Sequence, residues 1–539
     1  MPFFRRSIHF LCLSAIVSLY GCGGGSSSAR DRIVPGTSPS NGSVDIVVYG
    51  GTPAGVTAAL EAARLGKTVA LLEPSNHLGG MMTNGISFSD TYTQAAWGGI
   101  ATEIFQHIDD AYAGSAIAAH GTHFEPHVAE SVIKAMLTQQ PRIDVHLAAE
   151  LDHVVKSGTS LSAVVTVDGS AYVAKQFVDA SYTGDLMAAA GVSYASGREA
   201  VATYNESLAG AGPPIEVVPD VDPYNIPGDP TSGLLPHLDS TPTPPVGSAD
   251  SAIMAYNYRL CLSSDVSNQV PFTPPAGYSV HEFEALGRLV DQTIRSGSEV
   301  PITRFLFLAA LPGNKFDVNN AGFMSTDYPG ANRDYVGGSA DTRAAIEREH
   351  QRYTQAYLYF LSTDPRIPSA IQSQIRSLGY CKDEFTDNNG WPHRLYVREA
   401  RRMVGSYVVT QHDALGEITV DQSIGRAGYP FDQHFVHRYV QNGKIFVEGT
   451  GAPRPAPLSY PIAYGAIVPL RTEATNLLVA VALSASHVAL ESIRLELTYM
   501  IIGQSAGAAA SLAIDDKVAV QDVSYSRLSA QLGKDKQVL

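Results

Sequence analysis

The first apolar positions of the folded chain follow two different periods. Residues 44–49 are β-branched and mostly apolar, which predicts a strand buried on both faces. Residues 56–65 carry Ala and Leu at helical spacing and stop at Gly66. A second apolar run, 68–72, ends at Glu73. The pattern therefore predicts a strand, a helix and a second strand that is followed by an acid.

A glycine-rich turn joins the first predicted strand to the helix, and it consists of Gly50, Gly51, Thr52, Pro53, Ala54 and Gly55. Gly50 allows a tight turn, and Gly55 lets the helix pack closely on the strand. The helix N-terminus directs free N–H groups at a pyrophosphate, and Glu73 is placed to accept hydrogen bonds from ribose hydroxyls. Thr52 departs from the usual pattern because its Cβ crowds the middle glycine position. Together these features predict a dinucleotide site.

A second glycine cluster follows the acid and indicates which dinucleotide is bound. The residues that we expect to contact it are Pro74, Gly79, Gly80, Met81 and Met82. Glycines let the backbone pass close to a bulky ligand, and a nicotinamide enzyme has no need of such a loop at this point. The cluster therefore favours FAD.

The rest of the chain is predicted from the same patterns. We expect helices over 123–139, 341–363, 494–514 and within 515–539, and strands over 143–146, 151–155, 161–166, 177–180, 467–470 and 477–483. Residues 205–250 contain many prolines, which predicts irregular structure. The small residues of 503–510 indicate close packing against a strand or the cofactor, although a helix–helix contact explains them equally well.

Composition narrows the class of protein. The chain has 539 residues with a net charge of −15, and 45% of them are hydrophobic. So much apolar surface excludes intrinsic disorder. The negative balance argues against a nucleic-acid partner, which requires clustered Lys and Arg.

The N-terminus has the features of an export signal. Arg5 and Arg6 precede a short apolar run, and Cys22 stands before a Gly/Ser-rich stretch. This predicts a signal peptide over 1–21 and a flexible tether over 22–43, with Cys22 as the lipidated first residue. Simple cleavage nearby is the alternative. No later stretch is expected to span a bilayer, so the membrane contact is the lipid anchor alone.

The longer motifs resemble those of the FAD-dependent oxidoreductase family of bacterial proteins. The resemblance rests on 49–55 and 77–82, continues through 177–192, 255–262 and 395–403, and ends with 484–487 and 503–507. It implies an α/β fold in which a Rossmann-type FAD-binding domain, a parallel sheet with βαβ units, is interleaved with an α+β substrate cap. It also implies that Leu151 lies near the adenine through its backbone, that Ala180 passes the cofactor, and that 496–498 faces the flavin.

The predicted domain organisation follows from this resemblance. The ranges are 44–205 for the first part of the FAD-binding domain, 206–393 for the cap, 394–515 for the return to the FAD-binding domain and 516–539 for a peripheral helix. In an oxidising compartment Cys261 and Cys381 are able to pair, but the sequence does not show whether they meet.

The candidate catalytic residues are His434, His487 and Arg494. A histidine can move a proton while the flavin carries the redox step, and Asp432 lies near His434 in sequence. Arg398, Arg401 and Arg402 form a basic cluster that either binds an anionic substrate or pairs with acids across a domain seam. No metal motif is present.

Two functions are consistent with the sequence. The favoured one is an exported FAD-dependent oxidoreductase of the bacterial cell envelope, in the periplasm or as an outer-membrane lipoprotein. Its partners are a small-molecule substrate and an unidentified electron acceptor. The substrate is a hydroxyl compound, an amine or an activated alkene, including carbohydrate-related ones, and it exchanges hydride with non-covalently bound FAD. The alternative is a surface lipoprotein that keeps FAD as structure and acts as a binding component of a polymer-degrading system.

Overall fold

The computed structural model describes residues 43–90, 96–113, 121–216, 221–449 and 459–539. The predicted signal peptide, Cys22 and the tether up to residue 42 lie outside these residues. Within them, the central element is a sheet in which five strands run parallel in the order β3-β2-β1-β6-β21. Their bounds are Val44–Tyr49 (β1), Val69–Leu72 (β2), Ile143–His146 (β3), Ala171–Asp179 (β6) and Leu477–Val479 (β21). The prediction of an α/β fold with a βαβ unit is confirmed.

The sheet combines distant parts of the chain. Its strand β21 pairs with β6, and the Asn476 side chain donates a hydrogen bond to the carbonyl of Lys175, 301 residues earlier (3.0 Å). An antiparallel hairpin of β4 (Leu151–Ser157) and β5 (Ser160–Thr166) extends from the first half of β6. The chain therefore returns to the first sheet with β21.

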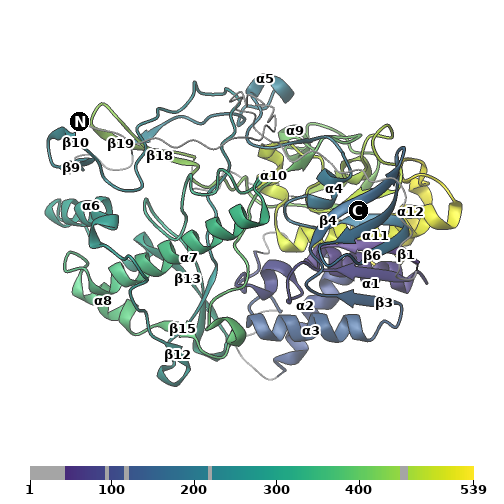
Figure 1. The fold of residues 1–539 in the computed structure, drawn as a ribbon, viewed down its shortest axis with the longest axis horizontal. Coiled ribbons are helices and arrows are strands. Elements are labelled where there is room, and N and C mark those ends of the chain that lie inside the picture. Colours follow the sequence, from purple (N-terminus) through teal and green to yellow (C-terminus); the bar gives the residue numbers. More distant parts are fainter. Residues whose placement is uncertain (1–42, 91–95, 114–120, 217–220, 450–458) are drawn as a thin grey trace, which may run out of the picture. The chain divides into compact units, whose positions relative to one another are not determined.

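Helices α1 (Pro53–Arg64) and α11 (Glu496–Asp516) pack against each other beside this sheet (Figure 1). A Cβ at position 503 would lie 2.1 Å from the carbonyl oxygen of Ala54, and one at position 507 would lie 2.3 Å from that of Ala58. The small residues of α11 therefore serve a helix–helix contact. Because 503 faces 54 and 507 faces 58, the two helices run in the same direction and their N-termini point to the same side.

Helix α11 also corrects one expectation about membranes. Its length and mean hydropathy of 1.3 are sufficient for a membrane span, so the expectation that no later stretch is apolar enough was wrong. However, 94% of its apolar window is buried inside the protein, as in the core helix of a folded domain.

Apart from α7, the remaining helices are shorter than α11. They are α2 (Gly99–Ala111), α3 (Pro126–Thr138), α4 (Asp185–Ala189), α5 (Val201–Tyr204), α6 (Glu284–Arg295), α7 (Ala340–Thr363), α8 (Ser369–Arg376), α9 (Gln411–Ala414), α10 (His487–Ile493) and α12 (Tyr525–Lys534). Several predicted elements differ from the structure. The helix expected from 123 begins at Pro126 (α3), and the strand expected over 177–180 is the end of β6, which begins at Ala171. The helix expected from 494 begins at Glu496, the strand expected over 477–483 ends at Val479, and 467–470 forms no strand because the chain makes a 3-10 turn over Tyr464–Ile467 (η8).

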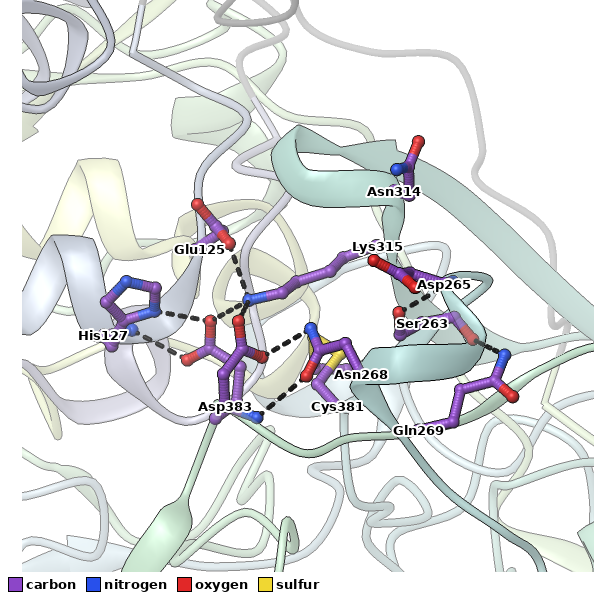
Figure 2. The surroundings of a disulfide bond; sticks show 12 residues. Glu125, His127, Ser263, Asp265, Asn268, Gln269, Asn314, Lys315, Cys381 and Asp383 are labelled. Atoms are coloured by element: carbon purple, nitrogen blue, oxygen red, sulfur yellow. Dashed lines mark hydrogen bonds and ion pairs between the residues drawn. A yellow bond between two sulfur atoms is a disulfide. The ribbon is translucent and has the colours of Figure 1, made fainter.

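The cap contains an antiparallel sheet in the order β12-β15-β11-β14-β13. Its strands are β11 (Leu260–Ser263), β12 (Gln269–Val270), β13 (Leu306–Leu311), β14 (Lys315–Asn320) and β15 (Gly379–Cys381). A disulfide joins Cys261 of β11 to Cys381 of β15, whose Cα atoms are 5.6 Å apart (Figure 2). The pairing that the sequence left open is therefore formed, between neighbouring strands of one sheet.

The other strands are short. They are β7 (Tyr194–Ala195), β8 (Ile215–Glu216), β9 (Tyr224–Ile226), β10 (Asp229–Leu234), β16 (Arg402–Met403), β17 (Ser423–Ala427), β18 (His437–Gln441), β19 (Lys444–Glu448) and β20 (Tyr460–Ala463). Strand β19 pairs with β8, so part of the segment predicted to return to the FAD-binding domain shares a sheet with the segment predicted as cap. The domain boundaries remain predictions.

Candidate functional site

The glycine turn places a helix N-terminus at the end of β1. Gly50 has a φ of +102°, and a Cβ there would lie 2.7 Å from the carbonyl carbon of Ala180. Thr52 caps α1, since its Oγ1 accepts from the Gly55 N–H (3.3 Å) and donates to the Ala180 carbonyl (2.7 Å). The N–H of Ala54 has no partner among the described residues. This free donor at a helix N-terminus fits a phosphate of a dinucleotide.

Glu73 is fully buried beside this turn. Its Oε2 accepts from the Gly51 N–H (2.7 Å), and its Oε1 accepts from the Ser75 N–H (2.9 Å) and from Arg394 (2.6 Å). A carboxylate offers about four acceptor positions, so one position remains for a ribose hydroxyl. Arg394 is a partner that the sequence did not predict.

The second glycine cluster packs directly on the first. The Gly79 N–H donates to the Gly51 carbonyl (2.7 Å), and a 3-10 turn, η1 (Gly80–Thr83), follows. The Met81 N–H donates to the Tyr182 hydroxyl (2.9 Å), which donates in turn to Glu496 at the start of α11 (2.7 Å). Both glycine loops and the N-terminus of α11 are therefore connected.

Three further predicted cofactor residues belong to the same surroundings. Pro74 directly follows Glu73, Met82 is buried within η1, and the N–H of Leu151 at the start of β4 donates to the Tyr49 hydroxyl (3.2 Å). The structure thus collects the predicted FAD-binding residues at the carboxyl ends of β1 and β2 and the start of β4, while their contacts with FAD remain a proposal.

His434 lies in a buried cluster of charged groups. Its Nδ1 is 2.7 Å from Oδ2 of Asp327, and its Nε2 is 3.3 Å from Oδ2 of Asp432. Burial opposes ionisation of Asp327, but the nearby Arg398 and His434 hold the pKa of this carboxyl below its usual range. Asp327 therefore orients the ring through Nδ1, and the longer contact of the ring, with Asp432, is at Nε2.

Arg494 belongs to the same cluster. Its Nη2 donates to Oδ2 of Asp432 (2.6 Å), and its Nη1 donates to the Tyr396 hydroxyl (2.8 Å). It lies two residues before α11 begins. The structure thus brings His434 and Arg494 together through Asp432, close to the N-terminus of α11.

His487 does not join this cluster. It is the first residue of α10, where its Nδ1 is 2.6 Å from Oε2 of Glu199 and its backbone N–H donates to the same oxygen (3.0 Å). Arg402 binds the other oxygen of Glu199 (2.6 Å). Among the described residues, no hydrogen bond or ion pair connects His487 with His434 or Arg494.

The basic cluster of 398–402 is divided among different acids. Arg398 pairs with Asp327 (2.9 Å), Arg401 with Asp185 (2.8 Å) and Arg402 with Glu199 (2.6 Å). Arg401 and Arg402 thus pair with acids, which was one of the two interpretations of this cluster. Arg398 contacts the acid that orients His434.

Two residues of the cluster were missed by the sequence analysis. Asp327 lies in no motif, and its neighbours along the chain give no signal of its role. Asp90 is the other: burial raises its pKa to about 6, Asp317 and Asp432 add to this increase, and Arg259 opposes it. A perturbed acid beside the cluster is a further candidate for proton exchange.

Two groups of possible metal ligands occur among the described residues, although no metal was predicted. In the group of His77, Asp387 and His393, the two rings are stacked, with centroids 3.7 Å apart. An imidazole binds a metal in its ring plane, so parallel rings do not share an ion in this arrangement. The other group consists of Glu125, His127 and Glu384. Here the Lys315 ammonium lies 2.6 Å from Glu125 and 2.8 Å from Glu384, where a metal ion would otherwise lie (Figure 2).

Comparison with known proteins gives a family match. The family model described as FAD dependent oxidoreductase matches residues 45–532, which is most of the chain. No curated protein matches the sequence.

Similar solved structures include p-nitrophenol 4-monooxygenase PnpA from Pseudomonas putida DLL-E4, with 15% identity over 29% of this chain and 45% of that chain and a TM-score of 0.22. L-proline dehydrogenase from P. horikoshii has 19% identity over 29% and 24% of the two chains, with a TM-score of 0.18. Thioredoxin reductase from T. acidophilum has 19% identity over 25% and 34%, with a TM-score of 0.17. The chain spans less than half the length of each of these proteins.

Proposed function

The chain belongs to the FAD-dependent oxidoreductase family, and on this premise we propose that it transfers hydride between a small organic substrate and non-covalently bound FAD, with His434 exchanging the substrate proton. The family makes the protein an FAD-dependent oxidoreductase with FAD as its cofactor. The substrate is a hydroxyl compound, an amine or an activated alkene, with carbohydrate-related compounds among them.

The observation that carries this proposal is the contact between His434 and Asp327. Asp327 accepts from Nδ1 (2.7 Å) and fixes the ring, so that Nε2 can take a proton from a substrate hydroxyl or amine, or return one to an alkene carbon. Arg494 holds Asp432 beside the ring. When bound, FAD supplies the hydride acceptor or donor. Residues 50–55, Glu73 and the loop of Gly79 and Gly80 would hold it.

The proposal is tested by anaerobic reduction of the purified yellow protein. We expect the flavin absorbance to bleach with at least one member of a panel of alcohols, amines and sugars, or the chemically reduced flavin to be reoxidised by an enoate. The alternative function is a lipoprotein that keeps FAD as structure within a polymer-degrading system. It is supported if no compound reduces the oxidised flavin or reoxidises the reduced flavin, while the protein binds a polysaccharide.

Export and lipid attachment form a separate proposal. It is supported by the basic residues, the apolar run and Cys22 of the N-terminus, which place the protein in the bacterial cell envelope, facing the periplasm or on the outer membrane. Cys22→Ala should release the protein from the membrane fraction. Cys12→Ala, which changes a residue of the predicted signal peptide, is the matched control and should leave the protein membrane-bound. Equal membrane association of both variants contradicts lipidation.

A further inference from the structure

The cluster around Asp327 contains three guanidinium groups, one of which has no ion pair among the described residues. Arg398 pairs with the Asp327 carboxylate (2.9 Å), and Asp432 is taken by Arg494 (2.6 Å). Arg438 of β18 donates to the backbone carbonyl of Asp327 (3.3 Å) and interacts with Tyr353. Asp90, a third carboxylate, lies near Asp432 and Arg494. Arg438 is thus the arginine of this cluster without an ion pair among the described residues.

Several N–H groups of these arginines have no hydrogen-bond partner among the described residues. They are Nε of Arg398, Nε and Nη1 of Arg438 and Nε of Arg494, and all are buried. A buried charged donor without a partner costs free energy. Such donors are retained where a ligand satisfies them.

The aromatic surroundings leave only the edges of two guanidinium groups for a ligand. The Arg398 guanidinium lies over the Tyr396 ring (4.7 Å to the centroid), and that of Arg438 lies over the Phe323 ring (5.8 Å). With a face covered, each group presents its N–H edge, which matches the two oxygens of a planar carboxylate.

We propose that the substrate carries a carboxylate and that Arg398 and Arg438 bind it, beside the cluster that contains His434. This inference rests on the proposed function and names its substrate class: an acid with a hydroxyl, amino or alkene group near the carboxylate. Both arginines and His434 contact the same residue, Asp327, so the carboxylate and the reacting group fit within one small molecule.

The test measures binding first and chemistry second. Benzoate, which has no oxidisable hydroxyl, amino or alkene group, and its neutral analogue benzamide are titrated into the holoenzyme while the flavin spectrum and the thermal midpoint are followed. We expect saturable binding of benzoate, at least tenfold tighter than that of benzamide. Equal binding of both, or binding of inorganic phosphate in preference to benzoate, overturns the proposal.

Matched variants assign the binding to these residues. Arg398→Gln and Arg438→Gln should each weaken benzoate at least tenfold, and Arg398→Lys should weaken it less because the charge is kept. Arg333→Gln removes an exposed arginine outside the cluster and should leave benzoate affinity unchanged. FAD content and the thermal midpoint of each variant show whether it is folded. If Arg398→Gln and Arg398→Lys both keep wild-type affinity, the assignment is wrong.

The two proposals fail in different ways. If carboxylates bind but none of the hydroxy, amino or unsaturated acids changes the flavin redox state, the proposed function fails and the anion site remains. If neutral alcohols bleach the flavin and benzoate does not bind, the carboxylate inference fails and the proposed function remains.

Discussion

Gly503 of α11 packs so closely on Ala54 of α1 that a Cβ at position 503 would lie 2.1 Å from the Ala54 carbonyl oxygen. The Thr57 hydroxyl adds a hydrogen bond to the carbonyl of Met500 (2.7 Å). Ala54 also carries the free N–H at the start of α1. The contact between the helices therefore fixes the position of the N–H group that we propose for the cofactor phosphate.

Gly503→Ala should separate the two helices and cost about 1–3 kcal/mol of stability, as overpacked cores do. We also expect reduced FAD content, because the N-terminus of α1 moves. Thermal unfolding and the ratio of flavin to protein absorbance measure both effects. Gly533→Ala is the control, since it lies in helix α12 and a Cβ there meets no atom within 4 Å. Equal midpoints for the two variants would contradict the tight contact.

Glu73→Gln should weaken FAD binding by at least tenfold. The variant loses the charged acceptor for the ribose and leaves Arg394 without its acid, and a hydrogen bond to a charged group contributes about 1.5–3 kcal/mol. Flavin retained after dialysis is the measurement. Glu103→Gln, which removes a half-exposed carboxylate on α2, should retain its flavin. Full occupancy in Glu73→Gln would remove this residue from the cofactor site.

His434→Ala should retain FAD and slow flavin reduction by substrate ~10²–10⁴-fold, the usual contribution of a general acid or base. Asp327→Asn should slow the same step, because the ring loses the charged acceptor that orients it. Stopped-flow reduction under anaerobic conditions provides the rates. Unchanged rates in His434→Ala exclude it from the mechanism.

His487→Ala tests the second predicted catalytic histidine. Because His487 binds Glu199 and lies outside the cluster of His434, we expect a lower thermal midpoint and a smaller effect on flavin reduction than in His434→Ala. A loss of reduction rate as large as that of His434→Ala would instead support the sequence prediction.

The contribution of Glu496 to the free energy of unfolding should fall as pH rises from about 5 to 8. Burial raises the pKa of Glu496 from 4.5 to about 8, so in this range the folded state keeps a proton that the unfolded chain has lost. Glu496→Gln cannot ionise and should gain stability relative to the wild type towards pH 8, on the order of a few kcal/mol. Chemical denaturation of the FAD-free protein at several pH values measures this.

Glu61 requires a parallel experiment, because its pKa is also raised to about 8, by burial and by Asp535. Glu61→Gln should remove its own share of the pH dependence, and the double variant should have the flattest profile. If the profile of Glu496→Gln runs parallel to that of the wild type, Glu496 is ionised in the folded protein.

The first βαβ unit could be predicted because its signals are local. The apolar period, the glycines and Glu73 lie within 30 consecutive residues. One local signal was missed: Thr52 is the N-cap of α1, which a Thr followed by Pro at the first helical position indicates. The apolar run 467–470 was misread, since Pro469 lacks the N–H that a sheet ladder needs.

The partners of the predicted catalytic residues could not be read from the sequence, because they come from distant segments. Asp327 precedes His434 by 107 residues, and Glu199 precedes His487 by 288. An aspartate in an irregular segment has no periodicity or motif that distinguishes it from a surface residue. Only the folded chain shows that Asp327 also gathers Arg398 and Arg438.

The pairing of β21 with β6 sets an order for biosynthesis. Strand β6 emerges from the ribosome early, but its neighbour Leu477–Val479 follows only after the whole cap has been made. Helix α11, which packs on α1, comes later still. The nucleotide-binding half therefore remains an open sheet until the C-terminal part of the chain is available. Truncated chains that end before residue 477 should bind no flavin, and cofactor incorporation becomes the last step of maturation rather than the nucleus of folding.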